Sequence, residues 1–224
     1  MTMNITENPE FIDALYEYLG EEYNQQREGD HLTDFLYCNY KTIIRKRGES
    51  LPTTNQQRMI YWVGNALQYY MQPVRPEDEK EYEIDGIKLR PDIENKYIAH
   101  LYVPLAEMKT TRAILSKFDP KQNEHYIRQM QGYCKCLGVT TAVLFTIFLL
   151  GDWWADPFPT PRAWTFEFTQ EEIDDNWKEI LRRRDIVHEA LKNGGLPREH
   201  IMAFKNECRY CENKPICPKG NGNG

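Results

Sequence analysis

The sequence has no long hydrophobic run and no recognisable leader. Its longest apolar stretch, residues 139–150, is shorter than the roughly 20 residues that a membrane-spanning helix needs. The first residues, MTMNITENPEF, hold neither a basic segment followed by an apolar one nor an arginine-rich amphipathic pattern. We therefore expect a soluble protein that stays in the cytoplasm or an equivalent compartment.

An excess of positive charge is also lacking. The formal net charge is −6 at pH 7, which argues against binding nucleic acid through a large nonspecific basic surface. Any contact with DNA would have to use local patches, and residues 45–47 and 182–184 are the candidates. Either run is also compatible with an ordinary solvated face.

The chain is long enough for one sizeable core with a small appended module, since it has 224 residues of which 41% are hydrophobic. The pattern predicts a helical region over residues 1–71, an α/β core over residues 72–193 and a cysteine-containing module over residues 194–224. The final GNGNG is expected to be disordered.

Residues 86–111 are predicted to form two extended segments joined by a turn. Asp85-Gly86 gives a hairpin signal before the first segment, which carries Asp92. The chain is expected to turn near residues 95–96 and to return through a second segment that ends in Glu107-Met108-Lys109.

Glu107 and Lys109 share one face of the second segment, because successive side chains of a strand alternate between faces. Asp92 can be delivered from the neighbouring strand. Two carboxylates suit a hard divalent cation, and a lysine beside them can orient an attacking water or stabilise charge on a phosphate. The same residue types also occur by chance on salt-bridged strand surfaces.

Two predicted helices flank this pair of segments. The first ends near residue 71 and places Gly64, which permits close backbone approach, one turn before Gln68. The second covers residues 121–137 and makes Gln129 and Tyr133 neighbours beside its apolar stripe. By itself, Tyr133 is more typical of a core tyrosine than of a binding residue.

The C-terminus holds three cysteines in a C-x2-C-x5-C spacing, Cys208, Cys211 and Cys217. Without a secretion signal, this spacing favours metal ligation over disulfides. A tetrahedral thiolate site needs a fourth ligand, and Cys134 and Cys136 lie on a helix whose apolar face can hide a thiol.

Cys38 is the remaining cysteine. We expect it in a helix that runs from residue 31 to residue 40 and is capped by Asp30. Four thiolates fit a 4Fe–4S cluster or zinc, and their number alone does not separate the two.

The order Pro91-Asp92, then Glu107-x-Lys109, resembles the core of the PD-(D/E)XK nuclease superfamily. That resemblance implies an α/β, restriction-endonuclease-like core in which a mixed sheet is flanked by helices. It also implies that Asp92, Glu107 and the Met108 carbonyl hold Mg²⁺ or Mn²⁺, and that Lys109 positions or helps to deprotonate water.

The flanking helices resemble those of the RecB-like branch of this superfamily. There, a metal-binding histidine stands four residues after the glycine, whereas this chain has Gln68. A glutamine oxygen can bind a divalent cation or a water in its shell, but it is a different ligand from imidazole. The pair Gln129-x-x-x-Tyr133 resembles residues that line the active site in these enzymes and help to hold the substrate.

Cys38 together with the C-terminal cysteines resembles the iron–sulfur exonucleases related to RecB-like proteins. This family includes the CRISPR-associated nuclease that works in spacer acquisition, a step of antiviral defence. The resemblance favours a 4Fe–4S cluster held by an N-terminal helical region and a C-terminal module. Such a cluster would crosslink segments that lie far apart in the sequence, and it would not be the reaction centre.

The resemblance implies a metal-dependent exonuclease that hydrolyses phosphodiester bonds at single-stranded DNA ends. It would act in recombination or repair, or in CRISPR spacer acquisition with integrase proteins as partners. The alternative is a catalytically weak DNA-binding or complex-stabilising protein on a nuclease scaffold.

Overall fold

The computed structural model describes residues 9–21, 28–71, 80–153, 155, 158–204 and 207–219. The C-terminal GNGNG lies outside these residues, so its predicted disorder remains a prediction. Within the described ranges, no helix is both long and apolar enough to cross a membrane.

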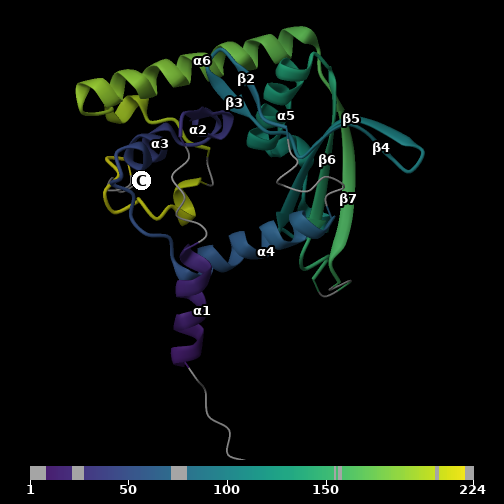
Figure 1. Ribbon diagram of the computed structural model, residues 1–224, viewed down its shortest axis with the longest axis horizontal. Coiled ribbons are helices and arrows are strands. Elements are labelled where there is room, and N and C mark those ends of the chain that lie inside the picture. Colours follow the sequence, from purple (N-terminus) through teal and green to yellow (C-terminus); the bar gives the residue numbers. More distant parts are fainter. Residues whose placement is uncertain are drawn as a thin grey trace, which may run out of the picture.

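The N-terminal region is mainly helical (Figure 1): α1 (Pro9–Glu21), β1 (Asp30–His31), α2 (Leu32–Leu36), α3 (Asn39–Lys46) and α4 (Asn55–Met71). The single helix predicted over residues 31–40 is wrong, because the backbone is extended at Tyr37 and Cys38 and separates α2 from α3. Asp30 is not the cap, because its backbone pairs with Ile87 and His31 takes the N-cap position of α2. Cys38 consequently stands at the N-cap of α3.

The first sheet has the strand order β1–β3–β2, with β2 (Tyr82–Ile84) and β3 (Ile87–Leu89) antiparallel and β1 parallel to β3. Asp85 and Gly86 join β2 to β3 with φ values of 52° and 76°. Positive φ at both central residues is what a type I′ hairpin turn requires. The predicted turn is confirmed.

The second sheet contains β4 (Ile93–Ile98), β5 (Leu101–Thr111), β6 (Thr141–Phe148) and β7 (Thr160–Glu167), in that order. β5 and β6 are parallel and are connected through α5 (Glu124–Leu137), whereas the other neighbours are antiparallel. The turn predicted near residues 95–96 is wrong, since β4 continues and the chain turns at residues 99–100. Asn95 has a φ of 45°, which asparagine tolerates, so the strand passes through it.

The architecture is therefore mixed α/β, with two mixed sheets rather than one, and helices flank them (Figure 1). The long helix α6 (Gln170–Asn193) begins with a capping box between Thr169 and Glu172 and ends at Gly194, whose φ is 80°. It packs against α2, α3 and α5.

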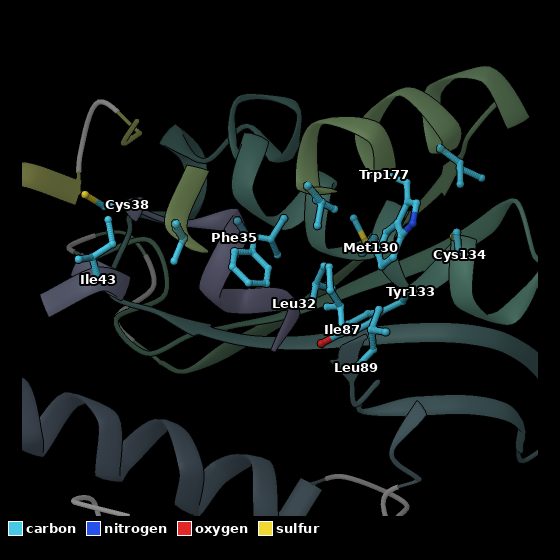
Figure 2. Close-up of a cluster of buried hydrophobic side chains, with 14 of the residues drawn as sticks. Leu32, Phe35, Cys38, Ile43, Ile87, Leu89, Met130, Tyr133, Cys134 and Trp177 are labelled. Carbon is cyan, nitrogen blue, oxygen red and sulfur yellow. The ribbon is translucent and has the colours of Figure 1, made fainter. Parts of the chain in front are cut away.

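The main core lies where α2, α5 and α6 meet the two sheets (Figure 2). Phe35, Met130 and Trp177 are among its buried side chains, and burying each such side chain contributes roughly 1.5–3 kcal/mol. A Cβ on Gly132 would lie 2.9 Å from Leu32 Cδ2, so any larger residue there would require the Leu32 side chain to shift. The predicted active site around Asp92 and Glu107 lies along one edge of this core.

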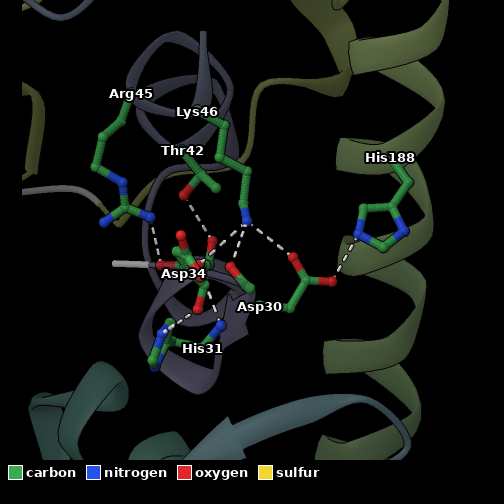
Figure 3. A network of polar contacts seen from close by, with 9 residues as sticks. Asp30, His31, Asp34, Thr42, Arg45, Lys46 and His188 are labelled. Carbon is green, nitrogen blue, oxygen red and sulfur yellow. Dashed lines mark hydrogen bonds and ion pairs between the residues drawn. The ribbon is translucent and has the colours of Figure 1, made fainter. Parts of the chain in front are cut away.

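A polar network joins β1, α2, α3 and α6 beside this core (Figure 3). Lys46 Nζ lies 2.8 Å from Asp30 Oδ1 and 3.7 Å from Asp34 Oδ2, and Arg45 also pairs with Asp34. His188 Nε2 on α6 lies 2.7 Å from Asp30 Oδ2. Asp34 is only 3% exposed, so these pairs compensate the burial of its charge.

Both basic runs that were candidates for DNA contacts have partners inside the fold. In the first run, Arg45 and Lys46 form the ion pairs described above, and Arg47 donates a hydrogen bond to the carbonyl of Ala190. In the second run, each arginine pairs with a carboxylate: Arg182 and Arg183 with Glu179, and Arg184 with Asp185. Arg183 and Arg184 also donate to backbone carbonyls. Much of this positive charge is therefore neutralised locally.

The C-terminal segment folds back onto the start of α3. The backbone N–H of Cys38 donates to Glu207 Oε1 at 3.0 Å. Asn39 makes two further bonds, donating from Nδ2 to the carbonyl of His200 and accepting the N–H of Met202 at Oδ1, each at 2.8 Å. These hydrogen bonds hold the C-terminal segment beside Cys38.

Candidate active site

The predicted acidic residues meet at an open edge of β5. Among the described residues, β4 pairs with β5 only as far as Ile93 opposite Ala106, whereas β6 follows β5 to Thr111. Asp92 stands directly before β4, at the point where that edge of β5 becomes free. A side chain at this position can bind the backbone that β4 leaves unpaired.

Asp92 uses both carboxylate oxygens in this way. Its Oδ2 accepts the backbone N–H of Met108 at 2.6 Å, and its Oδ1 accepts a hydrogen from Gln68 Nε2 at 2.6 Å. The N–H and C=O of one strand residue point to the same side, so the Met108 carbonyl also faces the open edge. The fold therefore brings together three residues that lie far apart in the sequence.

Glu107 is buried beside this group, with 2% of its surface exposed, and forms an ion pair with Lys109 Nζ. Burial and then the charge of Asp92 raise the pKa of Glu107 to about 8, despite the opposing effect of Lys109. Burial also raises the pKa of Asp92. Two buried carboxylates this close do not both ionise easily, so the pair favours keeping one proton at neutral pH.

The oxygen chemistry of this group fits a divalent cation. Glu107 Oε2 is buried and has no hydrogen-bond partner among the described residues. Carboxylate, amide and carbonyl oxygens are the ligands that Mg²⁺ and Mn²⁺ prefer. No group of three His, Cys, Asp or Glu side chains in the described part of the chain could hold a metal. This site has two carboxylates and the Met108 carbonyl, and Gln68 would offer its oxygen only with its amide turned.

Lys109 remains an ammonium group in this environment. Burial by itself would lower its pKa, but the negative charge of Glu107, followed by the influence of Tyr37 and Asp92, raises the pKa overall. A lysine that stays charged can orient water or stabilise charge on a phosphate, whereas it is a poor base at neutral pH. Of the two roles predicted for Lys109, this favours positioning.

Tyr133 on α5 lies near the carboxylates and is paired with Gln129, one turn before it on the same helix. Gln129 Nε2 donates to the Tyr133 hydroxyl at 2.8 Å, and each residue is 4% exposed. Burial, followed by the charges of Glu107 and Asp92, raises the pKa of Tyr133 well above its ordinary value. Tyr133 thus belongs to the hydrophobic core and lies near the acidic pair, so its two interpretations are compatible.

A cavity of about 340 Å³ opens beside this group, between α4, the edge of β5 and the start of α5. A Cβ on Gly64 would lie 3.0 Å from Thr110 Oγ1, which explains how α4 approaches β5 closely enough to form this wall. The lining residues are Tyr37, Ile60, Tyr61, Gly64, Asn65, Gln68, Met108, Lys109, Thr110, His125 and Tyr126.

Four ring-bearing residues among these, Tyr37, Tyr61, His125 and Tyr126, were not identified from the sequence. For α5 a signal exists, because His125 precedes Gln129 by four residues and Tyr126 precedes it by three, which places both on the same helix face. Tyr37 and Tyr61 carry no comparable signal, since Tyr37 reaches the cavity from the extended segment between α2 and α3 and Tyr61 reaches it from α4.

The four cysteines of the predicted cluster are free thiols near the start of α3. Cys38 and Cys217 are buried and Cys211 is half-buried, whereas Cys208 is exposed. Burial raises the pKa of Cys38 to about 11 with a smaller contribution from Cys217, and burial raises that of Cys211 with a smaller contribution from Cys208. Among the described residues, no three of these thiols form a group that could hold a metal, and the cluster stays a prediction.

No protein-family model matches the chain, and no curated protein matches it. Among solved structures, the chain resembles that of SSO0001 with a TM-score of 0.57 and 20% identity, over 97% of this chain and 98% of the other. This likeness shows a shared fold over almost the whole chain.

An alkaline exonuclease from Laribacter hongkongensis, LHK-Exo, gives a TM-score of 0.38 at 15% identity, over 69% of this chain and 81% of the other. Its complex with dAMP gives 0.40 at the same identity and coverage. These scores are too low to bear on function.

Proposed function

We propose that the chain is a divalent-metal-dependent deoxyribonuclease that trims single-stranded DNA from an end. The observation that carries this proposal is the meeting of Asp92, Glu107 and Lys109 at the open edge of β5, with an unpaired buried oxygen on Glu107. The motif order that resembles PD-(D/E)XK nucleases supports it.

In this proposal, Asp92, Glu107 and the Met108 carbonyl hold Mg²⁺ or Mn²⁺, and Gln68 contributes to the outer shell. The bound cation supplies Lewis-acid stabilisation of the phosphate and lowers the pKa of a coordinated water. Lys109, held as an ammonium, orients the attacking water and balances charge on the phosphate oxygens.

Gln129 and Tyr133 bind the strand near the acidic pair. The Oε1 of Gln129 is buried without a hydrogen-bond partner among the described residues, so it can accept a hydrogen bond from a substrate or from a water. Because the Tyr133 hydroxyl keeps its proton, it can donate to a phosphate oxygen. Both groups therefore suit contacts that fix the position of the strand.

We also propose that Cys38, Cys208, Cys211 and Cys217 hold a 4Fe–4S cluster, with zinc as the alternative metal. The C-terminal segment already lies against the N-cap of α3, where Cys38 stands. The cluster would tie the region of residues 1–71 to that of residues 194–224 around the nuclease core of residues 72–193. Iron, sulfide and zinc analysis of anaerobically purified protein decides between the metals.

A second candidate function rests on Gln68. Its amide nitrogen, rather than its oxygen, faces Asp92, an arrangement that stabilises the carboxylate without offering a further metal ligand. This favours a DNA-binding or complex-stabilising protein with weak catalysis. The physiological setting of either activity is a separate question: co-purification with integrase proteins would favour CRISPR adaptation over repair or recombination.

The test is degradation of end-labelled single-stranded DNA with Mg²⁺ or Mn²⁺ by anaerobically purified protein. We expect Lys109→Ala to abolish activity, whereas Lys96→Ala, which alters an exposed lysine on β4, leaves it intact. Closed circular strands should resist cutting. A wild type that binds DNA but cuts none of these substrates would favour the second candidate function.

A further inference from the structure

Aromatic rings form much of the cavity wall next to the proposed reaction centre. The ring centroids of Tyr37 and His125 are 5.8 Å apart, and those of His125 and Tyr126 are 4.0 Å apart. Tyr61 faces the cavity from α4. Lys109 Nζ lies 5.4 Å from the centroid of Tyr126, so the aromatic wall continues directly into the proposed phosphate site.

The cavity has the wrong chemistry for a second phosphate site. Burial and then the charge of Lys109 lower the pKa of His125 to about 4, so this imidazole is neutral near pH 7. Among the described residues that line the cavity, Lys109 is then the one cation. Neutral rings offer flat faces on which a base can stack, and the amides of Asn65 and Gln68 can bind base edges.

The size of the cavity restricts what can enter. Ligand pockets range from roughly 300 to 1,000 Å³, and this cavity of about 340 Å³ lies at the small end. Such a space suits a single unpaired nucleoside rather than a base pair. Tyr61 is 44% exposed, so part of its side chain is open to an entering base.

We infer that this cavity is a subsite for one unpaired nucleobase, which stacks on the ring of Tyr61 and packs against His125 and Tyr126 while its phosphate lies at Lys109 and the acidic pair. The inference rests on the proposed nuclease function and deepens it. The enzyme would require unpaired DNA because its chemistry begins only when a single base occupies the cavity. Stacking is tolerant of base identity, so sequence preference would be weak.

The experiment compares two end-labelled single strands, one of normal sequence and one with abasic sites at the three terminal positions. We expect the wild type to cut the normal strand about tenfold more efficiently, measured as kcat/KM. Tyr61→Ala should lose about tenfold on the normal strand and little on the abasic strand. Tyr70→Ala, on the same helix at 83% exposure, should behave as the wild type.

Equal losses on both strands would show that Tyr61 acts through the structure and would overturn the inference, as would no loss on either. Thermal melting verifies that both variants fold. If the wild type cuts neither strand, the nuclease proposal fails, and binding decides the inference separately. Quenching of a terminal 2-aminopurine by the wild type but not by Tyr61→Ala would then support the subsite, and no quenching would overturn it.

Discussion

The raised pKa of Glu107 predicts that replacing this residue by glutamine stabilises the metal-free protein at alkaline pH. Folding raises this pKa from 4.5 to about 8. Between these values, the folded protein retains a proton that the unfolded chain has lost. The free energy of unfolding of the wild type therefore falls as the pH rises through this window.

Glu107→Gln keeps the shape of the neutral carboxyl but cannot ionise. At pH 4.5 the free energies of unfolding of the two proteins differ only by a constant offset, because both folded proteins carry a neutral side chain at position 107. Above that pH, the stability of the variant relative to the wild type should rise by up to about 1.4 kcal/mol per pH unit. Over the whole window the upper limit is about 5 kcal/mol, and we expect about 2–5 kcal/mol because water and neighbouring groups relax around the charge.

The measurement is urea unfolding in EDTA at several pH values from 5 to 9, with Glu83→Gln as the control because Glu83 is exposed on β2. Parallel pH profiles for the wild type and Glu107→Gln would refute the reasoning, since they would mean that Glu107 titrates alike in both states. Adding Mg²⁺ provides a second test: about 2.7 kcal/mol of stabilisation is expected at a concentration 100 times Kd. The variant should not gain it.

Three further predictions concern other parts of the fold. Gly64→Ala should displace α4 and weaken metal binding measured by calorimetry, and Thr110→Ala in the same chain should restore it, because the added Cβ would meet the Thr110 hydroxyl at 3.0 Å. Cys38→Ala should lose iron and sulfide and melt at a lower temperature, whereas Cys136→Ala should keep its metal; full metal content and unchanged melting in the first variant would contradict the cluster. Lys46→Met should cost about 1–3 kcal/mol in urea unfolding, because Asp30 and Asp34 lose their shared partner.

Local chemistry predicts the parts of this fold that depend on a few adjacent residues. The Asp85-Gly86 turn is confirmed because only a short set of residues accepts two positive φ values. The turn near residues 95–96 is wrong because the same turn residues can also lie inside a strand. The pairing of Ile98 with Leu101 sets the register of β4 against β5, and this pairing outweighs the local turn signal.

The helix predicted from residue 31 fails for a related reason. Its composition suits a helix, but the pairing of β1 with β3 and the bonds from Cys38 and Asn39 to the C-terminal segment hold the chain extended between α2 and α3. These contacts join residues more than 50 positions apart. A local pattern carries no information about them, and for the same reason it could not place Tyr37 at the cavity.

The positions of the charges bear on how an acidic protein would hold DNA. The arginines and lysines that looked like DNA contacts in the sequence pair with carboxylates or carbonyls inside the fold. Each phosphate contact through a basic side chain adds to affinity and to salt dependence, so these two runs would add less to DNA affinity than their sequence suggests. Together, the paired basic runs and the small cavity favour the proposed recognition of a short piece of DNA, held where aromatic rings, Lys109 and the acidic pair meet. Under the proposed nuclease function, a site of that kind would accept one unpaired nucleotide, and an end offers a nucleotide with a neighbour on one side only.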